Sequence, residues 1–260
     1  MISCARFKLW FELKNVGCRR NECTIGDIYE FSRWLKESDG QMVELPVTQD
    51  PSIKKIVDDT WYQLGKEFEE LYARLSLEIP EKLMPRTELS FHEQVKLLGY
   101  LCVEIADLPG DILEIGVWKG KSLALMERLS SDDTKIVGVD PCELPGQFAE
   151  LTEFVVHLIP KASVVVGHSE KIAQDVVSFS KKFKLIHIDG GHERFNVWTD
   201  FLVYSHFLVA DGYIVFDDYN DSAVKAAIDE MHGYGLFDKF NVIGAPTNFP
   251  NSFVIQRRRK

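Results

Sequence analysis

The stretch D-I-L-E-I-G-V-W-K-G-K-S, residues 111–122, leads from a short apolar run into a helical pattern through a turn with two glycines. A run that is apolar at nearly every position is typical of a strand in a parallel sheet covered on both faces. Glycine at the turn permits backbone conformations closed to other residues and lets the main chain approach a ligand. The stretch therefore predicts the first strand, turn and helix of an α/β fold.

The spacing of Gly116 and Gly120 argues against two common nucleotide-binding loops. The dinucleotide fingerprint G-x-G-x-x-G is absent, because the spacing here is G-x-x-x-G. The tripeptide G-K-S does not complete a P-loop, because Ile115 occupies the position of the required earlier glycine. An NAD-dependent enzyme and an ATPase are both disfavoured.

Residues 111–257 alternate between β-rich runs and segments of helical spacing, which predicts right-handed βαβ units and a doubly wound sheet. The loop at 244–251 is too short for a crossover helix, so the last two strands should pair antiparallel. We predict a Rossmann-like seven-stranded sheet with five parallel strands and a C-terminal antiparallel hairpin. The predicted strands are 111–115, 135–139, 163–166, 184–189, 212–217, 240–243 and 252–256, and the predicted helices are 122–129, 173–180, 195–208 and 223–231.

The first 108 residues have helical patterning instead. Apolar residues recur at helical spacing over 61–75 and 91–105, and a further helix is predicted at 25–36. A mainly helical N-terminal appendage of this kind buries apolar surface. It could also serve as a lid or a dimer contact, and it is compatible with a homo-oligomer.

Composition favours a globular cytoplasmic protein. The chain has 260 residues, 45% of them hydrophobic and 27% charged, and no apolar run approaches the roughly 18 residues that cross a membrane. Charged residues interrupt any signal-peptide core near the N-terminus. The net charge of −10 disfavours nonspecific binding to nucleic acid. Five irregularly spaced cysteines predict free thiols.

Acidic residues follow the predicted strands at their carboxyl ends. Glu114 lies near the end of the first strand, and Asp140 ends the second in V-G-V-D-P. An acid at the end of the second strand is well placed to bind both hydroxyls of a ribose. Without phosphates to cradle, the glycine turn and this acid suit a nucleoside-type cofactor. The alternative is an acid that only caps a helix.

Three carboxylates and a histidine follow the fourth and fifth strands. I-H-I-D-G-G-H supplies Asp189 and His192, and Y-I-V-F-D-D-Y supplies Asp217 and Asp218. The carboxyl ends of adjacent parallel strands converge on one crevice, where unpaired carboxylates repel. Mg²⁺ prefers such hard oxygen ligands and would relieve the repulsion. The alternative is a set of separate loop acids that face solvent.

These motifs together resemble the class I S-adenosylmethionine-dependent methyltransferases over about residues 111–257. Within that class, P-G-D-I-L-E-I-G-V-W-K-G-K-S, I-D-G-G-H and I-V-F-D-D-Y resemble the metal-dependent sugar O-methyltransferases of the macrocin and mycinamicin type and the cephalosporin hydroxylase-like relatives. The resemblance implies an S-adenosylmethionine-binding methyltransferase domain at 109–260. Residues 1–108 would then provide lid, acceptor or oligomer contacts.

The resemblance also implies the cofactor residues of the first two strand ends. Glu114, Gly116 and Gly120 would line the methionine moiety, and Asp140 would hold the ribose.

The adenine would lie beside His168 and Ser169, although many relatives have an acid at position 168. Ser122 could add a hydroxyl at the helix N-terminus, with ordinary capping as the alternative.

For the reaction, the resemblance implies that Asp189, Asp217 and Asp218 bind Mg²⁺ or a similar divalent cation, which lowers the pKa of a chelated sugar hydroxyl. His192, with Asp189, is the predicted catalytic pair, and His192 would take the proton as the base. Some relatives carry an acid where Gly191 stands, and a purely structural His192 is the alternative. His187 is expected to face the helical layer and pack there.

The sequence thus predicts a Mg²⁺-dependent O-methyltransferase that methylates a hydroxyl of a sugar or glycosylated small molecule, with no nucleic-acid or membrane partner. The alternative is a non-catalytic S-adenosylmethionine-binding protein or a partner of a larger biosynthetic assembly. Hydroxylase chemistry is disfavoured, because the sequence has no clear 2-His-1-carboxylate iron triad.

Overall fold

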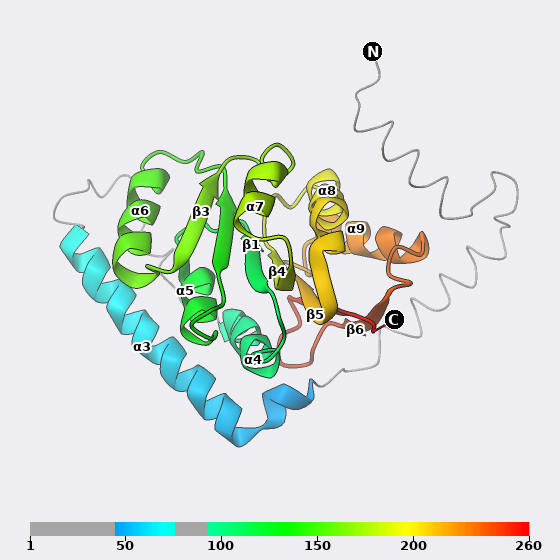
Figure 1. Cartoon of the computed structure of the whole chain (residues 1–260), viewed down its shortest axis with the longest axis horizontal. Coiled ribbons are helices and arrows are strands. Elements are labelled where there is room, and N and C mark those ends of the chain that lie inside the picture. Colours follow the sequence, from blue (N-terminus) through cyan, green and yellow to red (C-terminus); the bar gives the residue numbers. More distant parts are fainter. Residues whose placement is uncertain (1–44, 76–92, 260) are drawn as a thin grey trace, which may run out of the picture.

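A seven-stranded sheet runs through the centre of the protein in the order β3-β2-β1-β4-β5-β7-β6. The computed structural model describes residues 45–75 and 93–259, and Figure 1 shows the sheet crossing its middle. The strands are β1 Asp111–Ile115, β2 Ile136–Asp140, β3 Ala162–Val166, β4 Phe183–Ile188, β5 Leu208–Phe216, β6 Phe240–Gly244 and β7 Phe253–Arg257.

The pairing of the strands confirms the predicted fold class. Strands β1 to β5 pair in parallel, and β7 pairs antiparallel with both β5 and β6. The strand order reverses between β1 and β4, and such a switch point is where doubly wound sheets hold their ligands. The turn after β1 and the loop after β4 therefore meet at the expected binding crevice.

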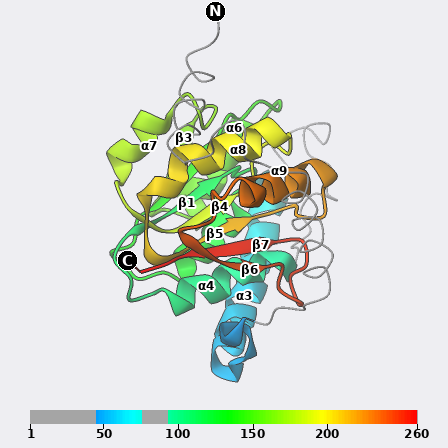
Figure 2. The same cartoon turned by 90° about the vertical axis from the view of Figure 1, so that its right-hand side faces the viewer.

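Helices cover both faces of the sheet. Figure 2 shows α7, α8 and α9 on one side and α3 and α4 on the other. The α-helices are α3 Pro51–Leu75, α4 Lys96–Glu104, α5 Lys121–Arg128, α6 Gln147–Leu158, α7 Ala173–Phe179, α8 Arg194–Tyr204 and α9 Ser222–Gly233, and short 3-10 helices span Pro46–Gln49, Glu93–Val95 and Ser205–Phe207. The apolar side chains of each face form a separate core cluster.

The helical N-terminal part packs directly onto this fold. Trp61, Leu64 and Phe68 of α3 belong to the same core cluster as residues of α5, α6 and the sheet. The rings of Phe68 and Phe154 lie with their centroids 4.9 Å apart. The predicted boundary at residue 108 stays a prediction, and the helix predicted at 25–36 lies outside the described residues.

One helix was not predicted, and another was predicted too long. No helix was predicted between the second and third strands, where the structure has α6 with Leu151, Phe154 and Leu158 buried on one face. The predicted helix at 195–208 ends early, because Leu208 pairs with Phe183 of the neighbouring strand and begins β5.

Two further sequence predictions concern membrane-spanning helices and free cysteines. In the part of the chain that the structure describes, no helix is long and apolar enough to cross a membrane. Cys102 and Cys142 are free thiols there, as predicted.

The glycine turn after β1 presses against the loop after β4. Gly116 has a φ of +89°, in the left-handed region, and its N–H donates to the carbonyl of Val139 over 2.8 Å. A Cβ added to Gly116 would lie 1.8 Å from the carbonyl oxygen of Asp189. Backbone atoms therefore leave no room for a side chain at this position.

Replacing Gly116 with alanine is expected to lower the free energy of unfolding by about 3 kcal/mol or more. A left-handed φ costs an ordinary residue about 1–3 kcal/mol, and the contact with Asp189 adds to it. Gly65 is the matched control, because a Cβ added there meets nothing within 4 Å. Gly65→Ala should stabilise α3 by about 0.5–1 kcal/mol. Urea denaturation measures both, and equal stability of the two variants would contradict the packing described here.

Candidate active site

The register of the sheet brings polar side chains from three strands to one place. Glu114 of β1 is the register partner of His187 of β4, so their side chains leave the same face of the sheet. Side chains alternate along a strand, so the same face receives Asp189 two residues further on. The N–H of Asp189 donates to Ile115 and that of Asp217 to Ile188, which continues the strand pairing to the acids.

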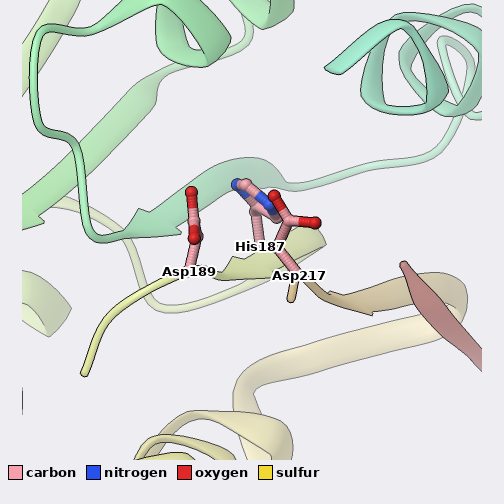
Figure 3. Close-up of side chains that lie close together, drawn as sticks. All are labelled: His187, Asp189 and Asp217. Atoms are coloured by element: carbon pink, nitrogen blue, oxygen red, sulfur yellow. The ribbon is translucent and has the colours of Figure 1, made fainter. Parts of the chain in front are cut away.

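His187 lies in the acidic cluster and not in the helical layer, so the packing role expected for it was wrong. Its Nδ1 lies 2.9 Å from Oε1 of Glu114, and the two side chains are 3% and 0% exposed. His187, Asp189 and Asp217 each offer one ligand atom within 4.8 Å of the others. Figure 3 shows these three side chains reaching the same place from the ends of β4 and β5.

The charge state of His187 follows from these neighbours. Burial lowers its pKa, but the hydrogen bond and charge of Glu114, together with Asp189 and Asp217, outweigh burial and raise the pKa to about 9. The contact with Glu114 therefore favours the charged form of the imidazole. Strand alternation could have predicted that His187 lies near Asp189, because residues 187 and 189 share one face of the strand.

A second cluster lies beside the first at the rim of the crevice. Asp189, His192 and Asp218 each offer one ligand atom within 4.8 Å of the others. Nε2 of His192 lies 2.8 Å from Oδ2 of Asp218, and the His192 side chain is 55% exposed. Asp189 is common to both clusters, whereas Asp217 belongs to the first and Asp218 to the second.

The loop before β7 holds the two acids that follow β5. Asn251 donates its side-chain amide to Oδ1 of Asp218 over 3.1 Å, and its carbonyl accepts the N–H of Tyr219 over 2.7 Å. The hydroxyl of Ser252 lies 3.4 Å from Oδ1 of Asp217. Asp218 itself has a φ of +53°, and strained conformations of this kind concentrate at functional sites. Sequence reasoning missed Asn251 and Ser252, because only the folded sheet brings them to the acids.

A small pocket beside the two clusters includes Asp189, His192 and Asp217 in its lining. Its lining residues are Ile188, Asp189, Gly190, Gly191, His192, Val197, Phe216, Asp217 and Val224. Burial raises the pKa of Asp189 well above its ordinary value; the charge of His187 lowers it, and the neighbouring carboxylates raise it further. A divalent cation would relieve this unfavourable concentration of negative charge, so the donor set fits Mg²⁺.

Asp140 closes the glycine turn. Its Oδ2 accepts the N–H groups of Val117 and Trp118 over 3.0 and 2.8 Å. Its Oδ1 accepts the N–H of Cys142 over 2.7 Å and the side-chain amide of Gln147 over 2.9 Å. A carboxylate has about four acceptor positions, so a ribose would have to share or replace these donors. The ribose role of Asp140 stays a prediction.

The rest of the glycine turn is held by a contact with α6 and by the start of α5. Lys119 is buried with its Nζ 3.5 Å from Oε1 of the buried Glu150 on α6. Gly120 is the N-cap of α5 with a φ of +78°. Ser122 therefore lies inside the first turn of α5, and the N-cap position that was its alternative role belongs to Gly120.

The segment after β3, predicted to lie beside adenine, is held by α8. The hydroxyl of Ser169 donates to Asp200, and the hydroxyl of Tyr204 donates to the carbonyl of Ser169 over 2.7 Å. Nε2 of His168 lies 3.2 Å from Oε1 of Glu143. Sequence reasoning missed Asp200, although an acid among the apolar residues of a helix is an unusual feature that indicated a buried partner.

Asp200 predicts a specific dependence of stability on pH. Burial raises its pKa from 3.8 to about 7, although the Ser169 hydroxyl opposes the shift and Glu170 adds to it. Because the folded pKa is the higher one, stability is lost as pH rises from about 4 to about 7. At about 1.4 kcal/mol per pKa unit, the loss approaches about 4 kcal/mol.

Asp200→Asn keeps an acceptor for Ser169 without the charge, so it should be more stable than the wild type at pH 8. The advantage should vanish toward pH 4. Urea denaturation at both pH values measures it, with the exposed loop variant Asp133→Asn as control. A constant difference between Asp200→Asn and the wild type across this range would contradict the assignment.

Comparison with known proteins finds a matching domain model and a viral relative. Residues 113–219 match the family model of a methyltransferase domain. An uncharacterized protein of Acanthamoeba polyphaga mimivirus is 29% identical over 188 residues, which cover 67% of this chain and 82% of that protein.

Two solved structures share the fold. The O-methyltransferase TomG from Streptomyces achromogenes, involved in tomaymycin synthesis and solved in complex with SAM, has a TM-score of 0.52 at 15% identity and covers 94% of this chain and 100% of that chain. CalS11, a TDP-rhamnose 3'-O-methyltransferase of calicheamicin biosynthesis, has a TM-score of 0.52 at 16% identity and covers 76% of this chain and 93% of that chain. At these identities the solved structures establish the fold.

The family match and the fold agree with the motifs of the sequence. Over residues 113–219 the chain is similar to methyltransferase domains.

Proposed function

We propose that the protein is a Mg²⁺-dependent O-methyltransferase that methylates a hydroxyl of a sugar or a glycosylated small molecule. The observation that carries the proposal is the pair of clusters that share Asp189, which lie at the switch point of the sheet against the glycine turn. The two clusters supply carboxylates and a half-exposed histidine. They lie at the crevice where doubly wound sheets bind their ligands.

The methionine end of S-adenosylmethionine would lie at the glycine turn. Glu114 is fully buried and its Oε2 has no hydrogen-bond partner, whereas Oε1 contacts His187. A buried carboxylate oxygen without a donor is costly, and the ammonium group of the methionine moiety would supply one. Gly116 and Gly120 would line the methionine moiety with their backbone, and S-adenosylmethionine supplies the electrophilic methyl group.

The ribose and adenine would lie along the next two strand ends. Asp140 would bind the ribose as some of its present donors are shared or replaced, and Ser169 would lie beside the adenine with His168. Asp200 and Tyr204 would hold Ser169 in place through the bonds that they already make. Ser122 would add a hydroxyl at the start of α5.

Asp189, Asp217 and Asp218 would hold the divalent cation, which when bound lowers the pKa of a chelated hydroxyl and orients it. Asn251 and Ser252 keep the two acids after β5 in position for this role. The chemistry of the site therefore requires carboxylates from two adjacent strand ends, as the register provides.

His192 would accept the proton of the acceptor hydroxyl. Its exposure lets it reach a bound acceptor, and its contact with Asp218 would orient the ring. The proton then passes to solvent from the exposed ring. Gly191 offers no side chain that could replace it.

The acceptor class rests on the sequence resemblance to sugar O-methyltransferases. CalS11, which shares the fold, is a TDP-rhamnose methyltransferase by its description, which agrees with a glycoside acceptor. We place the reaction in the cytoplasm and assign no nucleic-acid or membrane partner, in keeping with the net charge of −10.

The test is methyl transfer from isotopically labelled S-adenosylmethionine to a panel of nucleotide sugars and glycosides in the presence of Mg²⁺. We expect at least one acceptor to gain one methyl group on a sugar oxygen, located by mass spectrometry. Turnover with non-sugar phenols alone would contradict the acceptor class. Cofactor binding without turnover on either set would favour the non-catalytic alternative.

A further inference from the structure

A row of neighbouring side chains joins the proposed cofactor site to the proposed metal site. Glu114 of β1, His187 of β4, and Asp189 and Asp217 just beyond β4 and β5 lie on one face of the sheet, in adjacent rows of its register. Nδ1 of His187 contacts Glu114 over 2.9 Å, and a ring nitrogen of His187 lies within 4.8 Å of the carboxylates of Asp189 and Asp217. A single buried side chain therefore contacts Glu114 and lies beside the two acids.

We propose that His187 is a positioning residue that couples cofactor binding to metal binding, because it contacts Glu114 on one side and lies beside Asp189 and Asp217 on the other. This inference rests on the proposed function, because it needs both ligands to bind where that function places them. It assigns His187 no contact with the substrate and no part in the chemical step.

Packing leaves His187 little freedom to act otherwise. Its side chain is 3% exposed and that of Glu114 is 0% exposed, so neither can turn out to solvent. One oxygen of Glu114 is held by His187, and the other has no partner. The position of the unpartnered oxygen, which would face the cofactor, is therefore set by the histidine.

The sign of the coupling follows from competition for His187. Without a cation, Asp189 and Asp217 attract the same imidazole that contacts Glu114. When these two carboxylates bind a cation, they attract His187 less strongly. The hydrogen bond between His187 and Glu114 is then strengthened. Glu114 is then fixed before the cofactor arrives, so the cofactor loses less conformational freedom on binding. Each ligand should increase the affinity for the other by the same factor.

The experiment titrates the full chain with S-adenosylhomocysteine by calorimetry, once in EDTA and once in saturating Mg²⁺, at one pH. S-adenosylhomocysteine lacks the sulfonium charge, so direct repulsion by the cation does not obscure the result. For the wild type we expect the dissociation constant to be about 5-fold or more lower in Mg²⁺. Titration with Mg²⁺ in the presence and absence of S-adenosylhomocysteine should give the same factor.

Two substitutions separate the contacts of His187. The amide of His187→Asn replaces Nδ1 and keeps a donor for Glu114, but it does not reach the position of Nε2. The amide of His187→Gln reaches the position of Nε2 and loses the donor to Glu114. In both variants the Mg²⁺ effect on S-adenosylhomocysteine affinity should fall to about 1-fold. His232→Asn, a histidine beside Phe237 on α9, is the control and should keep the wild-type factor.

The outcomes distinguish this inference from the function on which it rests. A wild-type factor that persists in folded His187→Asn and His187→Gln, as judged by thermal melting, would overturn the coupling role and leave the proposed function intact. If Mg²⁺ binds the wild type but changes its affinity for S-adenosylhomocysteine by only about 1-fold, the coupling role is likewise overturned and the proposed function stands. Absence of Mg²⁺ binding to the wild type would overturn the metal dependence in the proposed function and this inference with it.

Discussion

Replacing Asp217 with alanine is expected to abolish methyl transfer while S-adenosylmethionine still binds. The substitution removes one of the proposed metal ligands, and with it the polarisation of the acceptor hydroxyl, a contribution of several kcal/mol to the transition state. At about 1.4 kcal/mol for each tenfold change in rate, kcat should fall by about 10³-fold or more. The affinity for S-adenosylmethionine should equal that of the wild type in EDTA, because Asp217 lies outside the glycine turn.

Asp221 provides the matched control for Asp217. It follows the same strand but caps α9, where its Oδ1 accepts the N–H groups of Ala223 and Val224. Asp221→Ala should lower the free energy of unfolding by about 1 kcal/mol and leave kcat close to the wild-type value. Steady-state kinetics and calorimetry on both variants give the comparison. An Asp217→Ala variant that keeps more than a tenth of the wild-type kcat would contradict the role of Asp217.

Replacing His192 with glutamine is expected to lower kcat by about 10²- to 10⁴-fold, the usual contribution of a general base. Glutamine can still contact Asp218 but cannot take a proton at neutral pH. Cofactor binding and Mg²⁺ binding should stay within a few fold of the wild type, because neither proposed site loses a carboxylate. Single-turnover kinetics separate the chemical step from binding.

The control for His192 is His157, an exposed histidine on α6 that contacts Glu153. His157→Gln should have wild-type kinetics. If His192→Gln lowers kcat less than threefold, the histidine is structural and another group takes the proton. That result would leave the metal proposal standing, since the carboxylates are tested separately.

The class of fold could be predicted from local patterns. Each parallel strand is a short apolar run and is followed by helical spacing, and the eight residues at 244–251 cannot hold a helix, so the terminal hairpin was foreseeable. The helix α6 was missed even though Leu151, Phe154 and Leu158 recur at helical spacing. The acids after β4 and β5 were also foreseeable, because they end apolar runs.

The partners of these acids could not be predicted, because they depend on strand order and register. The sequence does not show that β1 lies between β2 and β4, and only that order makes Glu114 the neighbour of His187. The contact of Asn251 with Asp218 likewise depends on β7 pairing with β5. The bonds of Asp140 to the glycine turn depend on how the turn closes.

The dependence of methyl transfer on a divalent cation tests the central claim most directly. The measurement is transfer of a labelled methyl group from S-adenosylmethionine to an accepted sugar, first in EDTA and then after excess Mg²⁺ is added. The proposed site predicts loss of activity in EDTA and its recovery with Mg²⁺. Full activity in EDTA would contradict a metal-binding role for Asp189, Asp217 and Asp218.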